Sequence, residues 1–330
     1  MSKNTPETVI TVDLGGTKIL SAIINRECQI IAFDQRPTKS NTGIDGVFGN
    51  IISSIKTVVN QTHLQDESAA IGICAPGIIN RQKGIVYRSP NLPGWENIEI
   101  KRLMEKATGR KTFLINDAKA AALGELHYGA AKGIKNCIYL TISTGIGGGI
   151  IIGGKLYSGY SGVAGEIGHM VIEPDGIACD CGSRGCWEKY ASGTAIAERA
   201  KYGITNGQKT KLVELVGGNL EKVDARIIQK AALSGDKFAK ELITESACYL
   251  AMGFGSLINI FNPEMIIIGG GYARMGKILL KPAFELAAKY SFKEPYTANH
   301  FRLAKLGSNS GIIGTAAYVF GELVENPVLI

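Results

Sequence analysis

The sequence predicts an α/β protein built from two structurally similar halves. Strand-like segments alternate with helical ones, and one device, a strand, a glycine turn and a returning strand, occurs twice. The chain has 330 residues, and at roughly 150 residues per domain this length suggests two domains. Because 45% of the residues are hydrophobic and 20% are charged, the chain can bury a large core, which excludes disorder and a small disulfide scaffold.

The repeated device is a β-hairpin with polar residues at its tip. The first copy has its strand, turn and returning strand over 8–13, 15–17 and 19–24, and a further strand is predicted over 28–33. The second copy has the same three parts over 137–143, 144–149 and 150–156. Two copies of one hairpin indicate two similar halves.

The remaining elements follow from hydrophobic spacing and cap residues. Before the second hairpin we expect helices over 44–60 and 118–128 and strands over 69–74 and 113–115. After an irregular stretch over 173–187, the capping residues Ser192, Asp224 and Asp236 predict three helices, ending near 202, 233 and 257. A strand over 265–268, a helical segment containing Pro282 and a last helix over 310–323 complete the chain.

No low-complexity linker marks a domain boundary, so the repeat has to supply it. We place the boundary near Asp117. The expected N-terminal domain comprises 1–117 together with a returning C-terminal helix over about 308–330, and the expected C-terminal domain comprises 118–307.

Composition excludes several classes of protein. The longest nearly apolar stretch, 249–261, is shorter than the about 20 residues that a membrane helix needs, and the N-terminus lacks the apolar region of a secretory signal. Seven cysteines, an odd number, favour thiols or metal ligands in a reducing cytoplasm over a disulfide framework. The net charge of +7 is scattered along the chain, which speaks against a nucleic-acid-binding arm and suits an anionic ligand.

The tip of the first hairpin is a candidate phosphate loop. Gly15 and Gly16 allow amide N–H groups to approach phosphate oxygens, Thr17 offers a hydroxyl and Lys18 a cation. Asp13, at the end of the preceding strand, could hold the waters of a Mg²⁺ ion. An ordinary Gly-Gly hairpin turn is an equal alternative at this point.

The second hairpin strengthens the phosphate-loop interpretation. Its run S-T-G-I-G-G-G, 143–149, contains Thr144 and Gly145 and more glycine than a turn requires. It does not fit the P-loop pattern, and it does not lead from a strand into a helix as a dinucleotide-binding loop does. Two such loops could clamp a triphosphate. Gly270, at a later strand end, would let an adenine or ribose approach the backbone, although a tight strand-to-helix turn explains it equally well.

The most specific constellation is a set of potential metal ligands. His169, Cys179, Cys181 and Cys186 form a Cys₃His group, and Gly182 and Gly185 allow the chain to wrap around an ion. Such a four-coordinate site is closed, so Zn²⁺ would be structural. Three cytosolic thiols without a ligand are the alternative.

Three carboxylates complete the candidate residues. Glu166 precedes His169 and Glu188 follows Cys186, so folding of the metal site would bring two carboxylates together to accept hydrogen bonds from hydroxyls, as on a sugar ring. Asp117, after Asn116, ends a strand and begins a helix, where the helix dipole helps to keep a carboxylate ionised. A helix cap is the simpler explanation of Asp117.

These motifs together resemble the ROK family of sugar kinases and sugar-responsive repressors. The resemblance covers about 11–314 and rests on D-L-G-G-T-K (13–18), A-P-G (75–77), N-L-P-G-W (91–95), N-D (116–117), S-T-G-I-G-G-G (143–149), G-E-I-G-H (165–169) and C-D-C-G-S-R-G-C-W-E (179–188). It implies two actin-like, ribonuclease-H-like α/β domains, with ATP and sugar meeting in an interdomain cleft.

The resemblance also implies a role for each residue. Asp117 looks like the catalytic base that accepts the proton of the sugar hydroxyl. The sugar-binding set would be Gly77, Asn91, Asn116, Asp117, Glu166, His169 and Glu188, with His169 also ligating zinc. The nucleotide set would be Asp13, Gly15, Gly16, Thr17, Lys18, Thr144, Gly145 and Gly270.

We therefore expect an ATP- and Mg²⁺-dependent hexose kinase of the glucokinase type, acting on the 6-hydroxyl of glucose. Kinases of N-acetylmannosamine or fructose remain open within the family. A repressor is disfavoured because only twelve residues precede Asp13, which is too short for a helix-turn-helix region. The expected partners are a sugar and ATP, with no nucleic acid and no membrane, and the expected assembly is a homo-oligomer, a dimer first.

Overall fold

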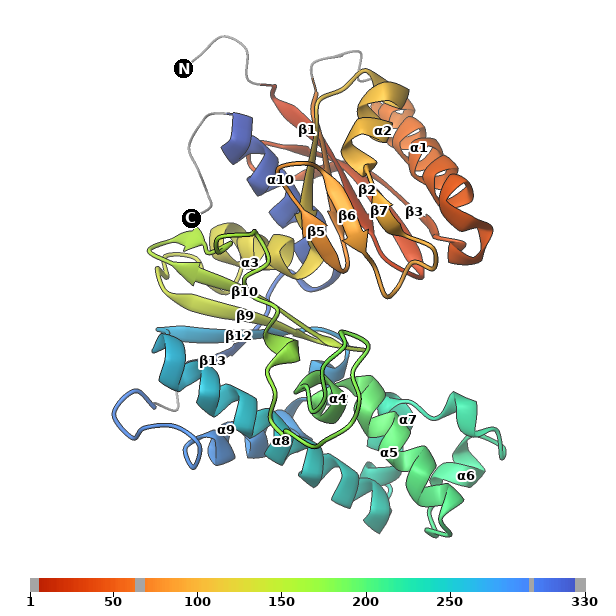
Figure 1. Ribbon diagram of the computed structural model, residues 1–330, viewed down its shortest axis with the longest axis vertical. Helices are drawn as coiled ribbons and strands as arrows, with labels where there is room; N and C mark the ends of the chain where they lie inside the picture. Colours follow the sequence, from red (N-terminus) through yellow and green to blue (C-terminus); the bar gives the residue numbers. More distant parts are fainter. Residues whose placement is uncertain (1–5, 63–68, 297–299, 324–330) are drawn as a thin grey trace. The chain divides into compact units, whose positions relative to one another are not determined.

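A computed structural model of the chain describes residues 6–62, 69–296 and 300–323, and it has the predicted α/β architecture (Figure 1). The chain divides into two compact units. The first takes the described residues up to Tyr139, the segment 149–165 and the described residues from Ala304 onward. The second takes 140–148 and the described residues of 166–303.

The first unit is built on a five-stranded sheet with the order β3-β2-β1-β4-β8. The strands are β1 Thr8–Leu14, β2 Lys18–Asn25, β3 Ile30–Pro37, β4 Ile71–Ala75 and β8 Thr112–Asn116. β1 and β2 form the predicted hairpin, whereas β1 pairs with β4, and β4 with β8, in parallel. The carboxyl ends of β1, β4 and β8 therefore lie at one edge of the sheet.

Helices cover both faces of this sheet. α1 (Gly43–Thr62) packs on one face and α10 (Ser310–Leu323) on the other (Figure 1). Ile10, Val12 and Leu14 belong to the core cluster that α1 completes. Because successive side chains of a strand point to opposite faces, Asp13 falls on the face of α10.

The helix that begins at Asp117, α3 (Asp117–Tyr128), packs closely on α10. A Cβ added to Gly314 would lie 1.6 Å from the Ala120 carbonyl oxygen, so only glycine allows this approach. The sequence places the domain boundary near Asp117, whereas in the structure α3 stays with the first unit because of this packing. Residues 324–330 of the predicted returning helix lie outside the described residues.

A small three-stranded sheet and one helix of the first unit had no counterpart in the sequence prediction. The sheet has the order β5-β6-β7, with β5 Ile78–Asn80, β6 Ile85–Arg88 and β7 Glu96–Ile98, and α2 (Ile100–Thr108) follows. Strands of three or four residues carry too little periodicity to be read from sequence. Trp95, which precedes β7, is buried in the core of this unit.

The second five-stranded sheet has the order β11-β10-β9-β12-β13. Its strands are β9 Cys137–Ile142, β10 Ile146–Ile152, β11 Lys155–Leu156, β12 Met265–Gly269 and β13 Phe301–Leu303. The predicted turn over 144–149 is wrong in length, because the run 147–149 lies inside β10. Close packing explains a glycine there, since a Cβ on Gly149 would lie 2.4 Å from the Cβ of Ala122.

Helices make up most of the rest of the second unit. They are η2 Ile167–His169, α4 Glu188–Ala191, α5 Gly193–Thr205, α6 Leu212–Leu215, η3 Leu220–Lys222, α7 Ala225–Leu233, α8 Lys237–Phe261, η4 Tyr272–Ile278 and α9 Leu280–Ala287. The three predicted caps are confirmed, since Ser192, Asp224 and Asp236 accept backbone N–H groups at the starts of α5, α7 and α8.

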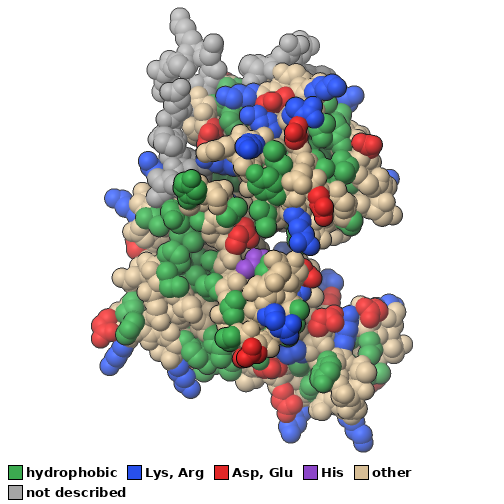
Figure 2. Space-filling view, in the orientation of Figure 1, with side chains coloured by type: hydrophobic (Ala, Val, Ile, Leu, Met, Phe, Trp, Pro, Cys, Tyr) green, Lys and Arg blue, Asp and Glu red, His purple; other side chains and the backbone are tan. Residues whose placement is uncertain are grey.

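Three further observations concern hydropathy, surface charge and the cysteines. Among the described residues, no helix is both long enough and apolar enough to span a bilayer. On the face of the described residues seen in Figure 2, Lys and Arg side chains are interspersed with Asp and Glu rather than gathered into one stripe. None of the seven cysteines forms a disulfide.

Candidate functional site

Two carboxylates meet at the edge of the first sheet. Asp13 lies at the end of β1 and Asp117 directly follows β8, with Cys74 on the strand between them. The pKa of Asp13 is raised to about 6, mainly by burial and also by the neighbouring charge of Asp117, while a hydrogen bond with Cys74 and the charge of Lys18 oppose the rise. Such closely spaced carboxylates suit a cation and proton transfer.

The first turn of α10 packs directly on Asp13. A Cβ added to Gly311 would lie 2.9 Å from Asp13 Oδ2, so the glycine lets the helix start against the carboxylate. The positive end of the helix dipole favours the ionised form of a nearby carboxylate and thus offsets part of the cost of burial.

Asn116, and not Asp117, caps α3. The Lys119 N–H donates to Asn116 Oδ1 at 3.2 Å, and Asn116 Nδ2 donates to the Gly77 carbonyl at 3.2 Å. Asp117 Oδ1 accepts from the N–H of Ala118 at 2.8 Å. Burial raises the pKa of Asp117, and backbone hydrogen bonds oppose this. Asp117 is therefore not needed as the N-cap of α3, because Asn116 is that cap.

The first glycine turn is braced from β3. Thr38 Oγ1 donates to the Gly15 carbonyl at 2.6 Å, and the Thr38 N–H donates to the Thr17 carbonyl at 2.9 Å. Thr38 is fully buried, whereas Thr17 and Lys18 are exposed at the tip. A rigid base with exposed donors is what a phosphate-binding turn requires. The sequence prediction missed Thr38 because no motif surrounds it.

Two further predicted residues lie beside this turn and beside Asn116. The loop carrying the exposed Asn91 packs on Gly16, where an added Cβ would lie 2.5 Å from the Asn91 carbonyl oxygen. Gly77 has φ of +98°, and an added Cβ would lie 2.2 Å from the Arg88 carbonyl oxygen. The structure thus brings together Gly16 with Asn91 and Gly77 with Asn116.

The second hairpin turns between β9 and β10. The Ser143 N–H donates to the Gly145 carbonyl at 2.9 Å, which leaves Thr144 exposed at the tip. The N–H of Ile146 donates to Glu188 Oε2 at 2.7 Å, and this carboxylate lies directly against Gly145. A predicted sugar residue and a predicted phosphate residue are therefore neighbours in the second unit.

Gly270 lies at the end of β12, next to the end of β9. It has φ of +95°, and an added Cβ would lie 2.3 Å from the Ile142 carbonyl oxygen. Close packing of two strand ends accounts for this glycine without a ligand.

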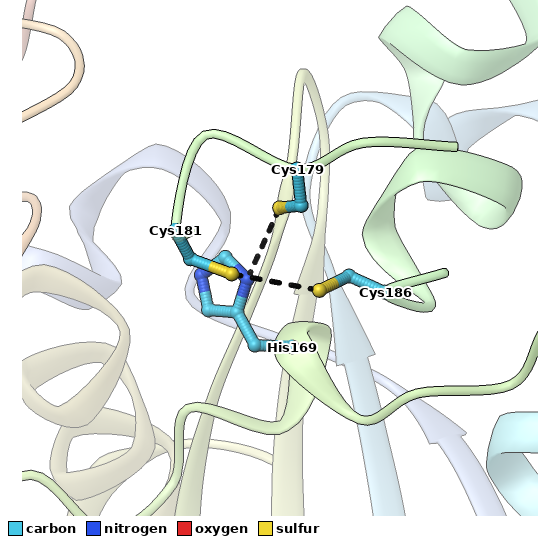
Figure 3. A group of neighbouring side chains, drawn as sticks. All are labelled: His169, Cys179, Cys181 and Cys186. Carbon is cyan, nitrogen blue, oxygen red and sulfur yellow. Dashed lines mark hydrogen bonds between the residues drawn. The ribbon is translucent and has the colours of Figure 1, made fainter. Parts of the chain in front are cut away.

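Four potential metal ligands converge in the second unit. The ligand atoms of His169, Cys179, Cys181 and Cys186 all lie within 4.8 Å of one another. Figure 3 shows the four side chains grouped together. His169 Nδ1 lies 3.6 Å from Cys179 Sγ, and Cys181 Sγ lies 3.6 Å from Cys186 Sγ. A tetrahedral zinc ion separates its ligand atoms by about 3.3–3.8 Å. The donor set and these two separations of 3.6 Å fit such an ion.

Glycine and one tryptophan shape the loop that carries these ligands. A Cβ on Gly185 would lie 1.6 Å from the Glu173 carbonyl oxygen, and Gly182 has φ of +97°. Trp187, next to Cys186, is fully buried and its Nε1 donates to the Tyr249 carbonyl of α8 at 2.7 Å. Its ring meets Phe254 edge-on at 5.9 Å. Trp187 therefore anchors the end of the loop, a role that the sequence prediction missed.

Glu166 and Glu188 flank this loop on its two sides. Glu166 precedes η2 and is exposed, and its carbonyl accepts the His169 N–H at 3.1 Å. Glu188 is the first residue of α4 and is partly buried. Glu166 therefore lies three residues before the potential ligand His169, and Glu188 lies two residues after the potential ligand Cys186.

Comparisons with known proteins cover nearly the whole chain. Residues 9–322 match the ROK family. A glucokinase of Thermotoga maritima is 38% identical over 311 residues, which are 94% of this chain and 96% of the relative.

Two solved structures share the fold. A ROK hexokinase from Thermus thermophilus has a TM-score of 0.82 at 33% identity, with 96% of this chain and 99% of the other covered. A ROK family glucokinase from Streptomyces griseus, in complex with glucose and AMPPNP, has a TM-score of 0.81 at 33% identity, with coverage of 94% and 98%.

Proposed function

Because the chain belongs to the ROK family, we propose that it transfers the γ-phosphoryl group of ATP to the 6-hydroxyl of glucose. The broader part of this, an ATP-dependent hexose kinase, is supported by glucokinase relatives of the same length and fold. The observation that carries the chemistry is the carboxylate of Asp117, which follows a strand end beside Asp13 and is not needed as the cap of α3.

Asp117 acts as the general base in this proposal. It accepts the proton of the attacking hydroxyl as the acceptor oxygen meets the phosphorus. Phosphoryl transfer depends mainly on positioning and on neutralising charge, so a base contributes less than alignment of the two substrates does. A pKa raised by burial brings the Asp117 carboxylate closer to the working pH and makes it a better base.

The two glycine turns hold the nucleotide phosphates. Thr17 and Lys18 at the tip of the first hairpin and Thr144 at the tip of the second are exposed donors, and Gly145, which is partly buried, follows Thr144. The raised pKa of Asp13 fits a carboxylate that receives a cation, and Asp13 is the residue that would hold the waters of Mg²⁺. When bound, Mg²⁺ neutralises phosphate charge.

Zinc in the Cys₃His set is structural in this proposal. With all four positions taken by protein, no position is left for a substrate. Its effect is to fix the loop that carries Glu166 and Glu188, which accept hydrogen bonds from the sugar hydroxyls. His169, with one ring nitrogen on zinc, donates its other ring N–H to a sugar oxygen. Asn91, Gly77 and Asn116 are the remaining residues that we propose for sugar binding.

A coupled assay of ADP release across a hexose panel tests the function. We expect glucose to give the highest kcat/KM among glucose, mannose, fructose, N-acetylglucosamine and N-acetylmannosamine. A site that hydrogen-bonds each hydroxyl rejects an analogue lacking one, because its own polar groups are then left unpaired. A preference for N-acetylmannosamine or fructose would correct the substrate, and no turnover of any hexose would overturn the kinase.

A further inference from the structure

Glu188 holds the turn of the second hairpin. Its Oε2 accepts the N–H of Ile146 at 2.7 Å, and a Cβ added to Gly145 would lie 2.2 Å from the same oxygen. Ile146 is 5% exposed and Glu188 is partly buried, so this hydrogen bond is partly shielded from water. A charged acceptor strengthens a hydrogen bond, and losing it would leave a buried N–H without that partner.

Residues on both sides of the metal-ligand loop contact the turn between β9 and β10. Before the loop, Gly168 packs on Ile146, where an added Cβ would lie 2.1 Å from the Ile146 carbonyl oxygen. After it, the N–H of Gly193 donates to the Ser143 carbonyl at 2.7 Å. Residues on both sides of the loop thus contact the turn, and Glu188 contributes the charged side chain among these contacts.

We propose that Glu188 is a positioning residue for the nucleotide-binding turn as well as a sugar-binding residue, and that it couples the two substrates. The inference rests on the proposed function for the identity of the substrates. One oxygen, Oε2, fixes the turn that presents Thr144 and Gly145. Through Oε1 the same carboxylate accepts a hydroxyl of the sugar.

This arrangement makes the coupling reciprocal. A sugar hydroxyl bound at Oε1 restricts the carboxylate to the rotamer in which Oε2 meets Ile146, so the turn is ordered before the nucleotide arrives. By thermodynamic linkage, a nucleotide that orders the turn improves sugar affinity by the same factor. A residue that binds only sugar would not affect nucleotide affinity when no sugar is present.

Nucleotide affinity without sugar is therefore the decisive measurement. We expect Glu188→Ala to weaken binding of AMPPNP about tenfold, because the turn loses a charge-assisted hydrogen bond. Glu188→Gln should lose at most about threefold, since its amide oxygen still accepts the Ile146 N–H. Lys189→Ala is the matched control on the same helix, where the ammonium bonds Asp180 at 2.8 Å, and it should keep wild-type affinity.

Two outcomes would overturn the positioning role. One is an AMPPNP affinity within twofold of wild type in Glu188→Ala. The other is an equal loss in Lys189→Ala, which would mean that any disturbance of the loop has this effect.

Hydrogen exchange at the Ile146 amide separates this inference from the proposed function. In protein free of substrates, Glu188→Ala should lose protection at Ile146, whereas Glu188→Gln should retain most of it. Unchanged protection would overturn the inference even if the wild type phosphorylates glucose. Lost protection would support it even if no hexose is a substrate, because the measurement involves no ligand.

Discussion

The two glycine hairpins of this protein are held by different means. The β1–β2 turn is braced by Thr38, directly after β3, and the carboxylates near it occupy ends of adjacent parallel strands. The β9–β10 turn is braced by Glu188 and Gly168, which flank an irregular loop with four potential metal ligands. One hairpin is positioned by a sheet, and the other by residues that flank a loop carrying the proposed zinc ligands.

This difference predicts which kind of substitution affects catalysis and which affects binding. A sheet with a large core fixes Asp13 and Asp117 through backbone pairing, so a side-chain change there alters chemistry more than structure. The metal-ligand loop has only turns and two isolated β-bridges, Val171 with Cys186 and Ala178 with Arg184, so a bound ion would add to its order. We therefore expect substitution of the carboxylates Asp13 and Asp117 to affect mainly turnover and substitution of the metal ligands to affect mainly binding.

Asp117→Asn should give the largest effect. The amide can still hydrogen-bond the hydroxyl but cannot take its proton, and loss of a general base typically costs about 10²–10⁴ in rate. Glucose and nucleotide affinities should persist, and thermal stability should hold because Asn116 caps α3. Steady-state kinetics with calorimetric binding checks this. A variant with wild-type kcat would show that Asp117 is not the base.

Cys186→Ser should affect binding more than turnover. We expect one tightly bound zinc per wild-type chain, and its loss should weaken glucose affinity by about 10–100-fold, since the ligands mount Glu188 beside the second turn. Elemental analysis and glucose titration measure both. Cys248→Ser, on α8 and outside the ligand set, is the matched control. Absence of zinc from freshly purified, unchelated wild type would contradict the assignment.

Much of the fold could be predicted because its signals are local. The first hairpin combines alternating apolar residues with a glycine turn, and Ser192, Asp224 and Asp236 are caps whose side chains act within three residues. The cysteine cluster could be predicted from ligand type and spacing alone. In each case the interacting residues are close together in the sequence.

The remainder depends on contacts between distant segments. Glu188 and Ile146 are 42 residues apart, and no sequence motif predicts the hydrogen bond between them. The pairing of Asp13 with Asp117 requires the parallel order β1-β4-β8, which residue spacing does not specify. The three-residue strands β5 and β7 exist because β6 pairs with both, so their sequence alone carries little signal.

Asp13→Asn should separate stability from activity. The folded pKa of about 6 lies above the ordinary value of 3.8, so the folded state binds the extra proton between about pH 4 and 6 and loses stability as pH rises through that window. Above pH 6 the ionised Asp13 carboxylate lowers the free energy of unfolding by about 1–2 kcal/mol, after allowance for screening by solvent. The variant should be that much more stable than wild type at pH 8, equally stable near pH 4, and poorly active. Chemical denaturation at both pH values checks this, and equal stability at pH 8 would contradict a costly Asp13 charge.

Thr38→Val should give the smallest effect and test whether the first hairpin is independent of the second. Valine keeps the branched shape and the backbone bond to Thr17, but the Gly15 carbonyl loses the hydroxyl that donates to it. We expect a loss of about 1 kcal/mol in stability and a few-fold rise in KM for ATP, with glucose affinity unchanged. Thr38→Ser retains the hydroxyl and should behave as wild type.

Combining Thr38→Val with removal of zinc tests whether the two hairpins are stabilised independently of each other. The two changes act on different turns, and effects at sites without shared partners add within about 0.5 kcal/mol. We therefore expect the valine variant to lose the same stability with and without a chelator. A loss that shrinks markedly after chelation would mean that the metal loop also supports the first turn, and the contrast between a sheet-held and a metal-held hairpin would have to be given up.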